Sequence, residues 1–137
     1  MNGLIYFREN NAYLCKNIFY NGKFRQRKIE QIIKTRKQAH SFYLKKSKAY
    51  QSFVELEQTT FKGGALSKLQ KELIAIGISV VLNCESCIEW HIKQALNSGA
   101  TENEIIESVE VEIEMGGGPA TVSARFAMNV LGYYRAT

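Results

Sequence analysis

The sequence predicts an all-α protein with one short β-hairpin close to the N-terminus. Apolar residues recur at spacings of three and four along most of the chain, which is the period of an amphipathic helix. Two capping boxes, at residues 67–70 and 101–104, mark helix starts. Glycine clusters at residues 63–64 and 116–118 mark helix ends.

The chain has 137 residues, the length of one domain with its own core. Its longest apolar run, residues 73–82, is about half as long as a membrane-spanning helix, so no membrane contact is expected. The N-terminus lacks the order of a secretory signal. Three cysteines fit reduced thiols with one reactive pair better than a secreted disulfide framework. We therefore expect a cytoplasmic protein.

The net charge of +5 is distributed unevenly. Residues 1–62 hold thirteen Lys and Arg against four Glu, whereas residues 63–137 hold five against nine. The basic half is compatible with nucleic-acid contact, but it has no recognised binding motif, and a solvated face is the favoured interpretation. We divide the chain into a basic N-terminal extension, residues 1–40, and a helical domain, residues 41–137.

The expected hairpin pairs residues 18–20 with residues 23–25 across Asn21-Gly22, because an Asn-Gly pair between aromatic runs is typical of a tight turn. Cys15 lies upstream of this turn and is expected to be inert. Two helices should follow, over residues 24–39 and 41–60, the first strongly basic.

A helix over residues 68–82 has apolar residues around most of its circumference and should be central and buried. Glu72 interrupts this surface. It is either an exposed first-turn carboxylate, which the helix dipole favours, or a group that faces the cysteines of the next helix and exchanges protons with them.

The remaining helices are expected over residues 84–97, from residue 102 to the triple glycine, and from Pro119 to about residue 134. Residues 116–118 are either a phosphate cradle or a close helix–helix corner. Without a following Lys-Ser/Thr the corner is the stronger interpretation.

The candidate chemistry lies in Cys84-x-x-Cys87-x-x-x-His91. If a helix starts near Cys84, Cys87 falls in its first turn and His91 one turn further along the same face. A helix N-terminus and a nearby imidazole both favour a thiolate. Cys87 is therefore the candidate nucleophile and Cys84 its disulfide partner.

Three other interpretations remain open. The cysteine pair could be half of a zinc site, although no second ligand pair follows at close spacing. The two cysteines could simply pack in the core, which leaves the histidine unexplained. Glu72, Cys84, Cys87 and His91 could together bind a metal, but we expect no metal and no cofactor.

From about residue 50 onward the chain resembles the alkylhydroperoxidase D-like, carboxymuconolactone decarboxylase family. The resemblance rests on residues 64–67, residues 71–74, the cysteine–histidine motif, residues 98–101 and residues 115–119, which follow one another in family order. It implies an all-helical fold that assembles into trimers or hexamers. It also implies reduction of a peroxide or a disulfide, with a thiol or dithiol as electron donor.

In the family pattern the second cysteine attacks the peroxide, which would be Cys87, and the first resolves the sulfenic acid, which would be Cys84. Residues matching Glu72 and His91 relay protons. The best-known alkylhydroperoxidase D has a histidine between its cysteines, where this chain has Glu85-Ser86. Carboxylates there and at position 89 would oppose a thiolate if they point at it.

The cysteine pair argues against lactone decarboxylation, because true carboxymuconolactone decarboxylases lack it. The sequence thus favours a peroxidase or disulfide reductase. The alternative is a non-enzymatic redox adaptor or sensor, whose disulfide state is read by a partner protein.

Overall fold

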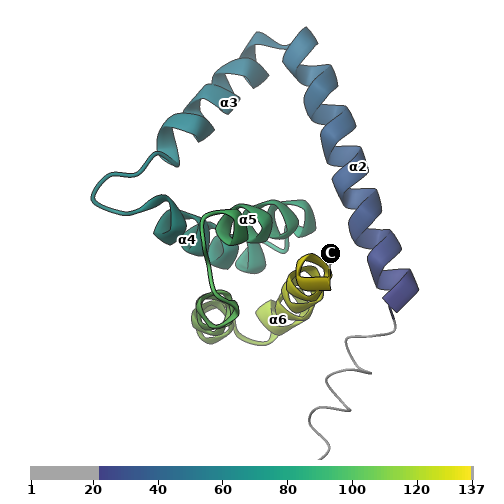
Figure 1. The fold of residues 1–137 in the computed structure, drawn as a ribbon, viewed down its shortest axis with the longest axis vertical. Helices are drawn as coiled ribbons and strands as arrows, with labels where there is room; N and C mark the ends of the chain where they lie inside the picture. Colours follow the sequence, from purple (N-terminus) through teal and green to yellow (C-terminus); the bar gives the residue numbers. More distant parts are fainter. Residues whose placement is uncertain (1–21, 137) are drawn as a thin grey trace, which may run out of the picture.

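The computed structural model describes residues 22–136, and all regular structure in this part of the chain is helical (Figure 1). In chain order the helices are α2 (Gly22–Lys46), α3 (Lys48–Thr60), α4 (Lys68–Val81), α5 (Glu85–Asn97) and α6 (Glu102–Ala136). The predicted all-α fold class is confirmed. None of the described helices combines the length and the apolar character that a membrane crossing requires.

The predicted hairpin is wrong at its second strand. Lys23, Phe24 and Arg25 form the start of α2, whereas residues 18–20 and Cys15 lie outside the described residues. Arg25 Nη1 donates to Asn129 Oδ1 of α6 at 3.0 Å. This contact joins the start of α2 to α6 across 104 positions of the chain, and a local turn signal cannot anticipate it.

The break between α2 and α3 comes later than predicted, at Ser47 rather than near residue 40. Ser47 is the N-cap of α3, and its Oγ accepts a hydrogen bond from Tyr50 N at 3.1 Å. Such a cap satisfies one of the free amides of the first turn. Ser41, the predicted start, lies inside α2, so this helix continues across the boundary proposed at residue 40.

The core lies where α4 packs against α5 and α6 (Figure 1). Its buried apolar side chains on these helices are Ile76, Val80, Ile88, Ile92, Ala95, Ile105, Val109, Ala120, Ala124, Ala127, Val130 and Leu131. We predicted that α4 is buried around most of its circumference, and in the single chain this is true only of the side that carries Ile76 and Val80. Ile74, Ile78 and Val81, on its other side, are about half exposed in the single chain.

The triple glycine forms a corner inside α6, between two helical segments. Gly117 has φ +64°, a left-handed conformation that glycine adopts without a Cβ clash. A Cβ at Gly116 would meet the side chains of Ala120 and Val81 at 2.8 and 3.3 Å. The close helix–helix corner favoured from the sequence is therefore what the structure contains.

Helices α2 and α3 form an arm, residues 22–60, of which α3 stands off the other three helices (Figure 1). Helix α2 lies against α5 and α6 and buries Ile29. Helix α3 has no buried residue, and Phe53 and Leu56 on it are 58% and 61% exposed. The space between this arm and α5 becomes part of the candidate site.

Candidate active site at the α4–α5 corner

The corner between α4 and α5 is built from backbone hydrogen bonds that end one helix and start the next. Asn83 adopts φ +53°, its N–H donates to Val80 O at 3.1 Å, and Cys84 N donates to Ser79 O at 3.0 Å. This is the Schellman pattern that closes a helix C-terminus. Cys84 is also the N-cap of α5. With almost no loop, α5 turns back beside α4.

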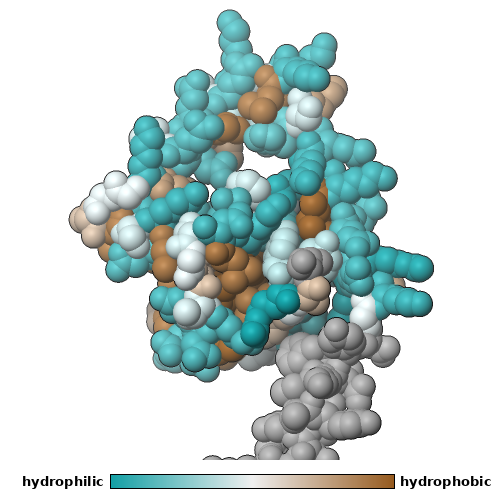
Figure 2. Space-filling model, in the orientation of Figure 1, coloured by the Kyte–Doolittle hydropathy of each residue, from teal (hydrophilic) through white to brown (hydrophobic). Residues whose placement is uncertain are grey.

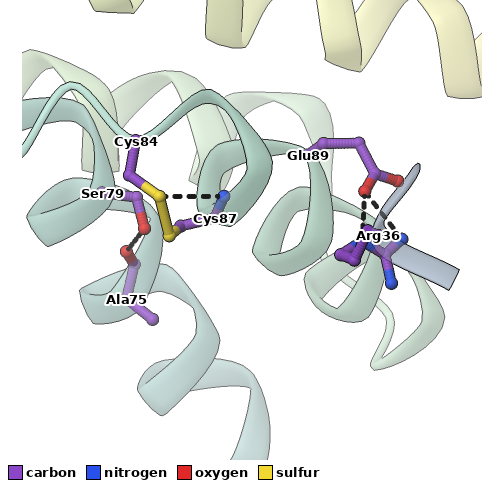
Figure 3. Close-up of a disulfide and its surroundings, with 6 residues drawn as sticks. All are labelled: Arg36, Ala75, Ser79, Cys84, Cys87 and Glu89. Atoms are coloured by element: carbon purple, nitrogen blue, oxygen red, sulfur yellow. Dashed lines mark hydrogen bonds and ion pairs between the residues drawn. A yellow bond between two sulfur atoms is a disulfide. The ribbon is translucent and has the colours of Figure 1, made fainter. Parts of the chain in front are cut away.

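Cys84 and Cys87 are joined by a disulfide at the start of α5, with their Cα atoms 5.2 Å apart (Figure 3). Cys87 N donates to Cys84 Sγ at 3.3 Å. From the sequence we expected the amides at the start of α5 to stabilise a thiolate at Cys87. In the structure the sulfur that accepts an amide hydrogen bond is that of Cys84. A hydrogen bond to sulfur favours its charged form, so Cys84 is suited to carry negative charge when the disulfide opens.

The turn at Asn83 brings Glu72 of α4 beside His91 of α5. Glu72 is 2% exposed, and its Oε2 lies 2.9 Å from His91 Nδ1. Of the two positions considered for Glu72, the exposed first-turn position is wrong. Glu72 is buried and turned toward α5, where its contact is with His91, and the predicted proton exchange with the cysteines stays a prediction. In the tautomer whose Nδ1–H donates to this carboxylate, Nε2 of His91 is left able to accept or return a proton. The ring of Phe61 stacks on the imidazole, with the centroids 5.3 Å apart.

A cavity of about 600 Å³ lies between the arm and α5. Among the described residues, Cys87 and His91 line it and Cys84 does not. Figure 2 shows the molecule hollowed between the arm and the helices below it. This volume is in the range of small-molecule sites. Cys87 and His91 therefore border one accessible space.

Glu85 and Glu89 do not act on Cys87 as unpaired charges, because both pair with cations of α2. Lys28 Nζ lies 2.5 Å from Glu85 Oε1. Arg36 Nε and Nη2 donate to Glu89 Oε2 at 3.0 and 2.7 Å (Figure 3). The predicted opposition to a thiolate depended on these carboxylates pointing at Cys87. In the structure they face α2, and each is neutralised there.

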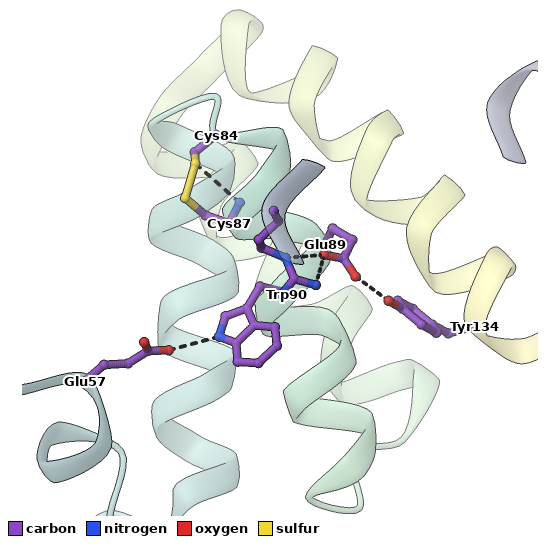
Figure 4. Close-up of polar contacts among 7 residues, drawn as sticks. Glu57, Cys84, Cys87, Glu89, Trp90 and Tyr134 are labelled. Carbon is purple, nitrogen blue, oxygen red and sulfur yellow. Dashed lines mark hydrogen bonds and ion pairs between the residues drawn. A yellow bond between two sulfur atoms is a disulfide. The ribbon is translucent and has the colours of Figure 1, made fainter. Parts of the chain in front are cut away.

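Glu89 is fully buried, and Tyr134 of α6 donates to its second oxygen (Figure 4). Burial and this hydrogen bond raise the pKa of Tyr134 above its ordinary value, so the phenol remains a donor. The guanidinium carbon of Arg36 also lies 4.4 Å from the centre of the Trp90 ring, a cation–π distance. Glu89 thus ties α2, α5 and α6 together one turn from the disulfide.

Trp90 connects α5 to α3. Its Nε1 donates to Glu57 Oε1 at 3.0 Å (Figure 4). Sequence reasoning missed Trp90, Arg36 and Tyr134 as site residues. One signal for Arg36 was available in the sequence. Glu85 and Glu89 are four residues apart and so share one face of a helix. In the structure this acidic face pairs with Lys28 and Arg36 of the basic helix α2.

Within residues 22–136, no group of three or more His, Cys, Asp or Glu is arranged to hold a metal ion. The four residues considered as a metal site instead form two pairs, a disulfide and a carboxylate–imidazole hydrogen bond.

Residues 47–129 match the carboxymuconolactone decarboxylase family. An uncharacterised protein of the cox locus of Paracoccus denitrificans is 41% identical over 80 residues, which are 58% of this chain and 72% of that protein. An uncharacterised protein of Cupriavidus necator is 35% identical over 64% of this chain and 75% of its own length. The alkyl hydroperoxide reductase AhpD of Anaeromyxobacter dehalogenans is 32% identical, over 46% of this chain and 39% of that protein.

Solved structures match the fold. A carboxymuconolactone decarboxylase family protein of Legionella pneumophila superimposes with a TM-score of 0.68 at 31% identity, over 80% of this chain and 96% of its own. A Thermotoga maritima family member, described in connection with an antioxidative response, has a TM-score of 0.71 at 24% identity, over 77% of this chain and 91% of its own. The latter likeness concerns the fold alone.

Proposed function

The chain belongs to the carboxymuconolactone decarboxylase family, and from this premise we propose that it is a thiol-dependent peroxidase or disulfide reductase. The observation that carries the proposal is the Cys84–Cys87 disulfide beside a cavity that Cys87 shares with His91. His91 is in turn oriented by the buried carboxylate of Glu72. A nucleophile, a resolving thiol and an oriented base are the parts that such chemistry needs.

In the proposed cycle His91 takes the proton of the Cys87 thiol, the resulting thiolate attacks one oxygen of a hydroperoxide, and the O–O bond breaks. The alkoxide takes a proton from His91 and leaves as an alcohol, while Cys87 becomes a sulfenic acid. Cys84 then attacks the Cys87 sulfur, the S–O bond breaks, and water leaves with a proton returned through His91. Two thiols and one peroxide have given one disulfide, one alcohol and one water.

A dithiol donor closes the cycle by thiol–disulfide exchange. Its thiolate attacks Cys87, the sulfur that lines the cavity, and Cys84 leaves. The leaving sulfur already accepts a hydrogen bond from Cys87 N, and a stabilised thiolate leaves faster. The donor gains a disulfide as the protein regains two thiols.

One comparison supports an antioxidant role over lactone decarboxylation, because one relative is an alkyl hydroperoxide reductase. The cysteine pair, which true decarboxylases lack, favours the same direction.

Thiol titration before and after one equivalent of peroxide, with peroxide loss followed in a dithiol-fed assay, tests the proposal. We expect two thiols to be lost and turnover to continue, and Cys87→Ser to abolish it. Two thiols lost once without turnover would replace the peroxidase with a redox adaptor whose disulfide state is read by a partner protein. An unaffected rate in Cys87→Ser would overturn the assignment of Cys87.

We also propose that the chain works as a homo-oligomer, a trimer or a hexamer. In the single chain several large apolar side chains of α4 and α6 are about half exposed or more: Ile74, Ile78, Val111, Met115 and Val122. Exposed apolar surface of this extent is typical of protein interfaces. Light scattering that gave the mass of one chain would contradict the proposal.

A further inference from the structure

The cavity beside Cys87 has two kinds of wall. Aromatic and aliphatic side chains of the arm and α5 form most of it, among them Tyr50, Phe53, Leu56 and Trp90. Hydrogen peroxide needs no apolar wall, and about 600 Å³ is far more space than it occupies. The walls therefore suit the organic body of a larger substrate.

The α2 side of the cavity is cationic. Arg36 and Lys37 both line it. Arg36 is fixed in place by its two hydrogen bonds to Glu89 and by the face of Trp90. Those bonds occupy Nε and one Nη2 hydrogen of a group with five N–H donors. Three N–H hydrogens of Arg36 remain beyond these two bonds, and a guanidinium with spare donors commonly binds a planar anion.

The carboxylate of Glu89, which pairs with Arg36, does not line the cavity. Glu89 is 0% exposed and is not among the residues lining the cavity, and its second oxygen is occupied by Tyr134. One lining carboxylate remains among the described residues, that of Glu57, and it accepts the indole N–H of Trp90. Arg36 is balanced in charge by Glu89 but keeps N–H donors that this pair does not use. Lys37, next to it on α2, adds an exposed cation to the lining, which holds the single carboxylate of Glu57 among the described residues.

We propose that the cavity selects organic hydroperoxides that carry a carboxylate, with Arg36 and Lys37 as the residues that recognise the acid group. This inference rests on the proposed peroxidase function and names its substrate class. The apolar body lies against α3 and Trp90, the carboxylate lies at the α2 side, and the peroxide group reaches Cys87. The chemistry is the same two-thiol reduction to an alcohol and water, with the carboxylate unchanged.

Binding can be measured apart from turnover, because Trp90 is the single tryptophan of the chain and lines the cavity. The probes are decanoate and 1-decanol, which share an apolar chain and differ in charge, and the signal is Trp90 fluorescence in the full-length protein. We expect decanoate to bind roughly two to five times more tightly than decanol, the range that partly exposed ion pairs supply.

Two variants remove the cations, and a third serves as control. Arg36→Gln combined with Glu89→Gln removes a buried charge pair together, which avoids leaving Glu89 unpaired. Lys37→Gln removes the exposed cation. Lys34→Gln makes the same charge change on α2, at an exposed residue that does not line the cavity. The preference for decanoate should fall toward equal binding in the first two variants and stay unchanged in the third.

The kinetic counterpart compares cumene hydroperoxide with its 4-carboxylate. The ratio of their kcat/KM values cancels any effect of Arg36 on the reactivity of Cys87 itself. The carboxylate should be preferred by the wild type, and the preference should disappear in the Arg36–Glu89 double variant.

The outcomes separate the two proposals. Equal binding of decanoate and decanol, no fluorescence response to either probe, or an equal loss of preference in Lys34→Gln would overturn the carboxylate site. Charge-selective binding without turnover of any hydroperoxide would leave the carboxylate site standing and remove the peroxidase function.

Discussion

Glu72 and His91 lie nineteen positions apart in the chain, yet their side chains meet at 2.9 Å between two helices that run side by side. Glu72 is buried, and its remaining environment is the core side of α4. A buried carboxylate is costly unless it is paired or hydrogen-bonded. Glu72 is hydrogen-bonded to an imidazole that lines the Cys87 cavity. The first prediction concerns this hydrogen bond.

Glu72→Gln should slow peroxide consumption about tenfold to a hundredfold, less than the roughly 10²–10⁴-fold of a group that transfers the proton itself, because Glu72 acts through His91. Glutamine fits the same space but cannot hold His91 with a charge. The check is the rate of Cys87 oxidation in stopped flow. Glu110→Gln, at an exposed position of α6, is the matched control. Equal rates in the wild type and Glu72→Gln would remove Glu72 from the mechanism.

Cys84→Ser should stop turnover and leave Cys87 as a sulfenic acid after one equivalent of peroxide, because no neighbouring thiol remains to resolve it. Serine is a favourable N-cap, so α5 should still start at the same place. Mass spectrometry after trapping with dimedone would show a single adduct on Cys87. An unmodified Cys87, with the peroxide intact, would show that the other sulfur reacts first.

Arg36→Ala should destabilise the fold by about 2 to 4 kcal/mol, because it leaves the fully buried Glu89 without its cation. Lys28→Ala is the control. Its ion pair with Glu85 is substantially exposed, and such pairs contribute about 0 to 1 kcal/mol. Urea unfolding of the two variants measures both free energies. If Arg36→Ala and Lys28→Ala lowered the free energy of unfolding by similar amounts, the Arg36–Glu89 pair would not behave as a buried ion pair.

Asn83→Ala should cost roughly 1 to 2 kcal/mol, since alanine is strained at φ +53°. It also removes Asn83 Oδ1, which accepts from the buried Ser123 Oγ at 2.7 Å. Asn83→Gly relieves the strain and loses only the hydrogen bond, so it should be the more stable of the two. Thermal unfolding ranks them. The reverse order would contradict a left-handed Asn83 at the α4–α5 corner.

Local signals predicted much of the fold correctly. The capping box at Ser67 is present with both of its hydrogen bonds, and the break at Gly117 and the α5 start at Cys84 follow the sequence pattern. These features depend on residues within one or two turns of each other. The N-terminal hairpin was wrong for the complementary reason: Arg25 is held by α6, far away in the chain.

The sequence by itself determined the helical elements, the order of the family motifs and the spacing that sets His91 one turn after Cys87. Caps, apolar periods and short spacings act through neighbours, so they can be recognised in the chain alone. Only the tertiary structure decided that Glu72 reaches His91, that Glu85 and Glu89 face α2, and that Arg36 borders the cavity. Those relationships depend on which helix faces dock, and docking is set by burial of side chains from distant parts of the chain.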